Sequence, residues 1–71
     1  MTTTHKEYLV KIGMELRVAR VRKGLTIQDV AEQIGMQASV LSSIERGSRD
    51  SHILTYKRFA DAVNVALKDV L

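Results

Sequence analysis

Hydrophobic residues recur along this chain at three- and four-residue intervals, the spacing that gathers side chains on one face of a helix. The longest such pattern runs from about residue 6 to residue 23 and contains two apolar stripes side by side. The first stripe comprises Leu9, Ile12, Leu16 and Ala19, together with Arg20. The second stripe comprises Val10, Met14, Val18 and Val21. A surface helix needs only one such stripe against its core, so the second requires a partner or a cover.

Glycines and capping residues set the boundaries of the next elements. Gly24 is expected to end the long helix in a left-handed conformation. Thr26 then caps a short helix over residues 27–34, with Asp29 at the position that completes a capping box. Gly35 ends this short helix, and the next helical pattern begins almost at once. Two short helices joined by so small a turn must cross steeply.

Three further helical segments complete the pattern. They span about residues 37–46, 52–63 and 67–71. Asp50 or Ser51 is expected to cap the second of these segments. Its core face is an apolar series at helical spacing, namely Ile53, Tyr56, Phe59, Ala60 and Val63. With residues 1–5 as a flexible tail, residues 1–71 are predicted to form one all-α domain, a compact bundle of four to five short helices.

The composition excludes several classes of protein. Cysteine is absent, which rules out disulfides and thiolate metal sites and favours a cytoplasmic protein. His5 and His52 lack the spacing of metal ligands, so we expect no metal and no cofactor. No nucleophile–base–acid set is recognisable, so an enzyme is not expected. No apolar run approaches the roughly 18 residues of a membrane span, and the N-terminus does not resemble a signal peptide.

Charge adds a weaker indication. Eleven Lys and Arg residues against eight Asp and Glu residues give a net charge of +3. This balance permits a polyanionic partner without requiring one. The cations concentrate at residues 17–23 and 46–49, and such clusters are more often solvated surface than a binding site.

The segment over residues 37–46 is unusual on its outer side. Its inner side carries Val40, Leu41 and Ile44, whereas its outer side carries Ala38, Ser39, Ser42 and Ser43. An ordinary surface helix presents long charged side chains there. Short, uncharged side chains instead allow a helix backbone to approach base edges in a DNA major groove about 12 Å wide. A solvated serine-rich face is the alternative interpretation.

Two short helices, a glycine turn and a bare outer face form a helix-turn-helix. At this point the chain resembles the Cro/cI-type (XRE family) DNA-binding domains, which have the lambda-repressor-like fold. The resemblance is carried by LTIQDVAEQIGMQASVLSSIERG, with Ala31, Gly35 and the ending Ile44-Glu45-Arg46-Gly47. IGMELRVAR upstream and NVALKDVL downstream extend it to about residues 12–71. It implies a sequence-specific regulator of transcription that binds double-stranded DNA, as a homodimer on a palindromic operator.

The resemblance also implies roles for individual residues. Base reading is expected from Gln37, Ala38, Ser39, Ser42 and Ser43. Phosphate contacts are expected from Arg17, Gln28, Arg46, Ser48 and Arg49. Backbone N–H groups at the helix starts near Ile27 and His52 can add further phosphate contacts. Arg20 and Glu45 are expected to form a partly buried, structural ion pair between the first and third helices.

Two positions depart from the family pattern. The second helix usually begins with a phosphate-binding glutamine, but Ile27 stands there, and only Gln28 offers a substitute. The third helix usually has a Ser or Thr cap where this chain has Gln37. The lack of a Ser or Thr cap is therefore expected to lower the stability of the start of the third helix by about 1 kcal/mol.

Apolar residues on the predicted surface indicate how the chain associates with a partner. A homodimer is expected to form through the fourth helix and the closing segment, by way of Leu54, Val65, Leu67, Val70 and Leu71. The second stripe is another candidate for self-association, unless the N-terminal residues fold back over it. An antitoxin-like module that binds a partner protein through the first helix, and DNA secondarily, is the alternative function. A phage or plasmid repressor and a restriction-modification controller are both compatible with the sequence.

Overall fold

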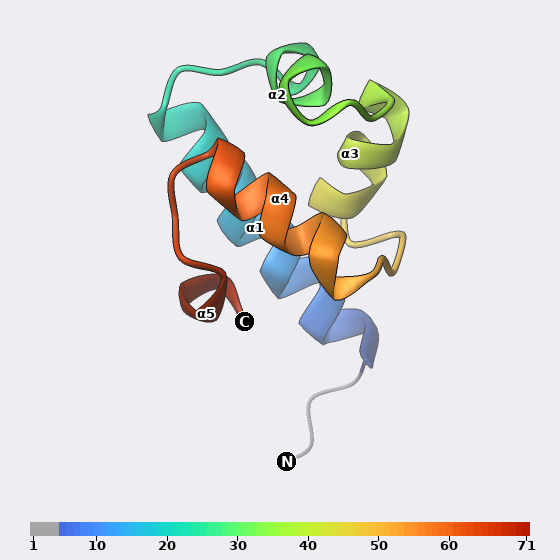
Figure 1. Cartoon of the computed structure of the whole chain (residues 1–71). Coiled ribbons are helices and arrows are strands. Elements are labelled where there is room, and N and C mark those ends of the chain that lie inside the picture. Colours follow the sequence, from blue (N-terminus) through green and yellow to red (C-terminus); the bar gives the residue numbers. More distant parts are fainter. Residues whose placement is uncertain (1–4) are drawn as a thin grey trace.

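Five helices account for most of residues 5–71, the part of the chain that this computed structural model describes (Figure 1). They are α1 (His5–Arg22), α2 (Ile27–Ile34), α3 (Ala38–Glu45), α4 (Ile53–Ala62) and α5 (Leu67–Val70). The predicted all-α bundle is confirmed, and its helix bounds were close to those observed. The expected tail over residues 1–5 was wrong for His5, which begins α1, while residues 1–4 lie outside the described part.

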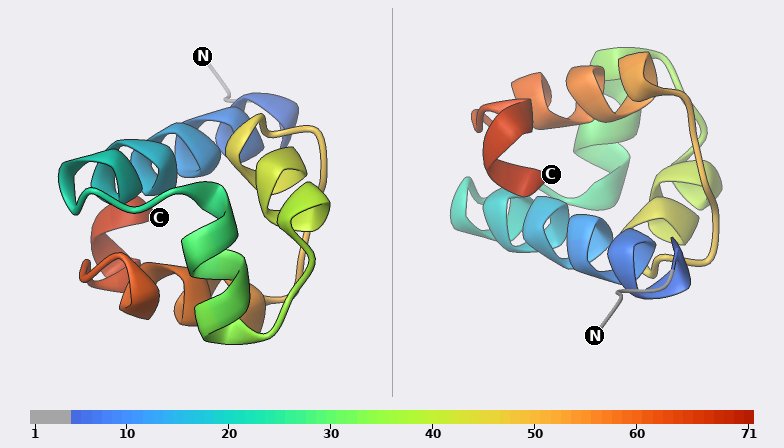
Figure 2. Two further views of the ribbon diagram at one scale, coloured as in Figure 1. Left: turned by 90° about the horizontal axis from the view of Figure 1, so that it is seen from above. Right: turned by 90° about the horizontal axis from the view of Figure 1, so that it is seen from below.

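The helices surround one core. Figure 2 shows α1 and α4 on opposite sides of the molecule, with α5 between them at one end. α3 packs against α1 and α2, and α2 packs against α4. The largest fully buried side chains come from four of the helices and are Leu16, Val30, Leu41, Ile44 and Phe59. No helix within residues 5–71 is long and apolar enough to cross a membrane.

Local signals in the sequence explain where α2 begins and ends. The Asp29 N–H donates to the Thr26 hydroxyl at 3.0 Å, and the Thr26 N–H donates to the Asp29 carboxylate at 2.8 Å. This reciprocal capping box satisfies two donors at the start of the helix, as its spacing predicted. Gly35 follows the helix at φ 70°, in the left-handed region that suits glycine.

Two cations hold the carboxyl ends of helices. The Arg58 guanidinium of α4 donates to the Ile34 carbonyl at the end of α2, at 2.5 Å. The Lys23 ammonium donates to the Ala62 carbonyl at the end of α4, at 3.0 Å. Positive charge at a helix C-terminus is favourable because unpaired carbonyl oxygens concentrate negative partial charge there. Lys23 and Arg58 therefore have structural roles.

The start of α4 differs from the prediction. His52 occupies the capping position without a side-chain hydrogen bond, and Asp50 instead accepts from the Ser51 N–H at 2.8 Å. Ile53, expected in the core, is 55% exposed, because it is the first residue of α4 and lies at the edge of the buried face. Ala62, which the prediction did not include, is buried at the other end of the helix.

α1 and the end of α3 approach each other at two glycines. A Cβ atom at Gly13 would overlap the Ile44 carbonyl oxygen and lie 2.6 Å from that of Glu45. A Cβ atom at Gly47 would lie 2.5 Å from the Cα atom of Val10. Both contacts need a residue without a side chain. They hold α3 against α1 at a separation that no larger residue allows.

Candidate nucleic-acid interface

The turn between α2 and α3 brings the two helices into close contact. The backbone N–H groups of Gly35 and Met36 both donate to the Ala31 carbonyl, so the chain leaves α2 within two residues. Ala31 itself is 2% exposed, and its small side chain allows the helices to approach. α3 starts at Ala38, directly after the capping residue Gln37, whose side chain makes no capping hydrogen bond.

α3 has an inner and an outer side, as the sequence pattern indicated. Leu41 and Ile44 are buried in the core. Ser39 is exposed on the outer side. Ala38, Ser42 and Ser43 are partly exposed, and Gln37 is exposed at the helix start. The five residues expected to read bases therefore stand at the N-terminal end of α3 or on its outer side.

Two of the hydroxyl groups on α3, those of Ser42 and Ser43, already form hydrogen bonds with neighbouring residues. Ser43 donates its proton to the Ser39 carbonyl at 3.0 Å. The guanidinium of Arg46 donates to the hydroxyl oxygens of Ser42 at 2.5 Å and Ser43 at 3.3 Å. Ser48 donates to the Ser43 carbonyl at 3.2 Å. With its proton used within the helix, Ser43 can only accept hydrogen bonds from outside, a property that the sequence pattern did not reveal.

Arg20 and Glu45 form the ion pair that the resemblance implied. Arg20 donates from Nε to one Glu45 carboxylate oxygen at 2.6 Å and from the terminal nitrogen Nη2 to the other at 3.1 Å. The other terminal nitrogen donates to the Leu25 carbonyl at 2.7 Å. The two side chains are only 14% and 8% exposed. The hydrogen bond to Glu45 raises the pKa of Arg20 above its ordinary value, while burial opposes this shift.

The expected phosphate ligands lie around α3. Arg17 and Arg46 line one groove between α1 and α3, whose volume is about 650 Å³ and whose wall includes Ile27. Arg49 is exposed in the loop after α3. Neither Arg17 nor Arg49 has an ion-pair or hydrogen-bond partner within the described residues. Gln28, exposed on α2, donates only a long 3.4 Å hydrogen bond to Glu32.

One contact holds the loop that carries Arg49. The imidazole Nε2 of His5 lies 3.1 Å from a carboxylate oxygen of Asp50, so the first residue of α1 contacts the loop between α3 and α4. Both side chains are well exposed. Within residues 5–71, no three His, Asp or Glu side chains gather as a possible metal site.

Leu54 lies apart from the other residues expected to form a dimer, which belong to the closing segment. Leu54 is 70% exposed at the start of α4, whereas α5 lies near the other end of that helix (Figure 2). Leu71 is 41% exposed, and Val65 and Leu67 are partly exposed. Val70 was a wrong choice, because it is 3% exposed and packs into the protein's own core.

The second stripe of α1 lies open to solvent. Its four side chains are between 40% and 58% exposed. Residues from His5 onward are helical and do not fold back over the stripe. The expected fold-back of the N-terminal residues over this stripe also involves residues 1–4, which lie outside the described part of the chain.

The sequence is similar to a known protein family and to a known protein. Residues 11–70 match a protein family described as a helix-turn-helix domain. An uncharacterized HTH-type transcriptional regulator of Sinorhizobium fredii, y4dJ, is 34% identical over 55 residues. This alignment covers 78% of the present chain and 71% of the relative.

Solved structures show the same fold. The restriction-modification controller protein C.AhdI from Aeromonas hydrophila superposes with a TM-score of 0.82 at 30% identity, covering 89% of this chain and 96% of C.AhdI. The clp gene regulator ClgR from C. glutamicum superposes with a TM-score of 0.84 at 27% identity, covering 89% of this chain and 81% of ClgR. The lambda-repressor-like bundle expected from the sequence agrees with both structures.

Proposed function

This chain belongs to the helix-turn-helix domain family of DNA-binding transcriptional regulators, and we propose that it binds a palindromic operator as a homodimer with α3 in the major groove. The outer side of α3 is the observation that carries the proposal. Its positions 38, 39, 42 and 43 hold only Ala and Ser. A helix about 10–12 Å across with its side chains fits a groove about 12 Å wide, and short side chains on the inserted side let the helix backbone come close to the base edges.

Base reading falls to the N-terminal end and outer side of α3. Gln37 is exposed and makes no capping hydrogen bond, so its amide can pair with adenine. Ala38 follows it and suits a thymine methyl group. Ser39 and Ser42 are further contacts on the same side. Ser43, whose proton is donated within the helix, is suited to accept from a cytosine or adenine amino group.

Phosphate binding falls to the groups that flank α3. Arg17 on α1 and Arg49 after α3 have side chains without an ion-pair partner within residues 5–71, and Arg46 lines the same groove as Arg17. Ser48 in the loop after α3 and Gln28 on α2 are exposed and complete the set. Such contacts fix the register of a protein on DNA without reading its sequence. About five phosphate contacts per subunit predict a slope of log K against log salt of about −4.5 per subunit.

Two copies are needed because one α3 contacts only a few base pairs. In dimers of this fold, the two recognition helices meet half-sites about 34 Å apart on one side of the DNA. The operator is therefore proposed to be palindromic, with its half-sites one helical turn apart. A regulator of this kind blocks or recruits RNA polymerase according to where its operator lies.

Selection of bound fragments from random duplexes tests the proposal. We expect enrichment of a symmetric motif, with binding that weakens steeply as salt rises. Gln37→Ala should change the enriched bases, whereas the control variant Lys68→Ala, in the exposed part of α5, should leave both motif and affinity unchanged. Equally weak binding to all duplexes at low ionic strength would refute sequence-specific regulation.

A further inference from the structure

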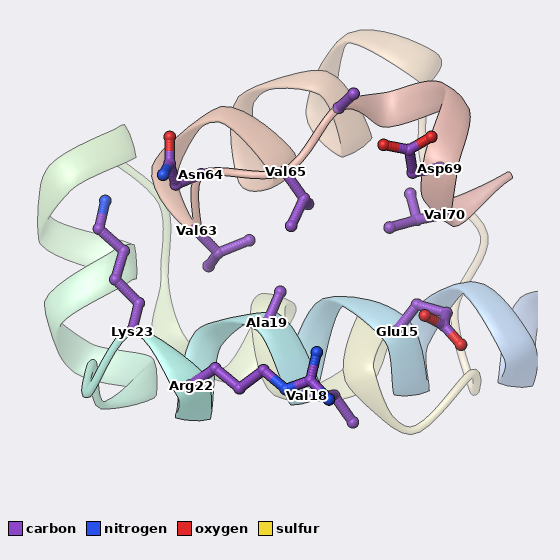
Figure 3. Close-up of a pocket in the computed structure, with 11 residues that line it drawn as sticks. Glu15, Val18, Ala19, Arg22, Lys23, Val63, Asn64, Val65, Asp69 and Val70 are labelled. Atoms are coloured by element: carbon purple, nitrogen blue, oxygen red, sulfur yellow. The ribbon is translucent and has the colours of Figure 1, made fainter.

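A groove runs beside the exposed face of α1, on the side away from α3 (Figure 3). It has a volume of about 510 Å³ and lies between the second half of α1 and the segment that joins α4 to α5. Val18 and Ala19 of α1 form one wall, and Val65 and Val70 form the other. Val18 also belongs to the second stripe, so the groove continues that apolar surface. The second stripe and the closing segment, which the sequence pattern indicated as two separate candidates for self-association, therefore meet here.

The charges around this groove are arranged by sign. Glu15 and Asp69 lie at one end, and Arg22 and Lys23 lie towards the other (Figure 3). Lys23 is engaged with the carbonyl at the end of α4. The side chains of Glu15, Arg22 and Asp69 have no ion-pair or hydrogen-bond partner within the described residues. An apolar groove with unpaired opposite charges at its ends fits an occupant that carries the reverse order of charges.

A second α1 helix that runs antiparallel to the first presents its charges in that reverse order. Glu15, Val18 and Arg22 follow one another at three- and four-residue spacing, so their side chains lie within about 60° on one face of the helix. An antiparallel second α1 would place its Arg22 beside Glu15 and its Glu15 beside Arg22. The two-fold axis then passes between positions 18 and 19, and the two Val18 side chains lie on either side of it. The same register brings Met14 of each copy close to Val21 of the other, which covers part of the second stripe.

We propose that two copies of this chain associate through an antiparallel contact between their α1 helices, centred on Val18. The contact is isologous, since the same patch on each copy meets itself about a two-fold axis. This contact supplies the interface of the proposed homodimer, so the inference rests on the homodimer in the proposed function. α1 touches α3 at Gly13, about 140° around the helix from Val18, so the pairing leaves the outer side of α3 free.

Charge reversal tests the pairing by sedimentation equilibrium without DNA. Glu15→Arg and Arg22→Glu should each raise the dimer Kd by about tenfold or more, because two attractive contacts become repulsive. An equimolar mixture of the two variants should regain wild-type association as a heterodimer. The double variant carrying both changes should regain it as a homodimer. Leu54→Glu, on an exposed leucine at the far end of α4, is the control and should leave the Kd unchanged.

Thermal melting of each variant separates loss of pairing from loss of folding, since all changed residues are exposed. A monomer at all concentrations, failure of the mixture to recover, or a Kd raised by Leu54→Glu instead of by the α1 variants would overturn the pairing. A stable partner of different sequence that displaces the second copy would overturn it as well. A variant monomer that still binds duplexes leaves the DNA-binding proposal standing, whereas a dimer that binds none refutes only that proposal.

Discussion

Removal of Glu45 gives the most direct measure of how α3 is held. Glu45→Ala removes the carboxylate partner of Arg20, whose side chain is 14% exposed in the intact pair, and leaves its guanidinium with only the Leu25 carbonyl as a hydrogen-bond acceptor within residues 5–71. Breaking a buried ion pair by deleting one partner costs about 3–5 kcal/mol, whereas an exposed pair contributes about 0–1 kcal/mol. The slight exposure of this pair places its loss near the lower end, at about 3 kcal/mol. For a domain of this size, about 4–8 °C per kcal/mol then gives a fall in Tm of roughly 12–24 °C.

Thermal unfolding followed by circular dichroism at neutral pH measures this shift. Glu32→Ala is the matched control, because Glu32 is exposed and its only described contact is the long hydrogen bond from Gln28. The control should change stability by no more than about 0.5 kcal/mol. Combining Glu45→Leu with Arg20→Met should recover most of the loss, since it removes the unpaired buried charge. Equal melting shifts for Glu45→Ala and Glu32→Ala would refute the buried-charge reasoning.

Three further outcomes are expected. Alanine favours helices over glycine by about 1 kcal/mol, yet Gly13→Ala should lower stability by about 1–3 kcal/mol in urea unfolding, because its Cβ meets the carbonyls at the end of α3. Hydrogen bonds from the backbone and side chain of Thr26 lower the pKa of Asp29 below its ordinary value, so this carboxylate contributes stability above its unfolded pKa that is lost as pH falls through the folded pKa. In an NMR titration, Thr26→Ala, which removes the hydroxyl but keeps the backbone N–H, should raise that pKa part of the way, and an unchanged value would contradict the contribution of the hydroxyl. Arg49→Ala should weaken binding to all duplexes alike and reduce the salt slope by about 0.9, and a changed base preference would count against a phosphate contact.

Much of the fold could be predicted because its boundaries are set by nearby residues. Thr26 and Asp29 form the capping box within a single turn, and Gly35 provides the left-handed residue that ends α2. Apolar spacing likewise identified the buried sides of α2 and α3. Such signals act over three or four residues, so the sequence contains them in full.

Features that depend on contacts between distant segments were harder to predict. The role of Gly13 comes from a carbonyl more than thirty residues away, and nothing near it in the sequence indicates that contact. Ile53 fits the spacing of a core residue, but α4 starts at that position and leaves it in solvent. Val70 was assigned to a dimer surface because the sequence does not show that α5 folds inward. The engagement of Arg46 with two serines is likewise a matter of side-chain geometry.

On α3, the side chains that anchor the helix and those that face outward belong to different residues. Leu41, Ile44 and Glu45 fix it to the rest of the protein, whereas positions 38, 39, 42 and 43 contribute mostly small groups at the surface. Under the proposed function, one copy of a duplicated gene can therefore acquire a new target by exchanging those four positions while its fold stays intact. The same separation would allow these four positions to be exchanged in engineering a set of regulators that bind different operators.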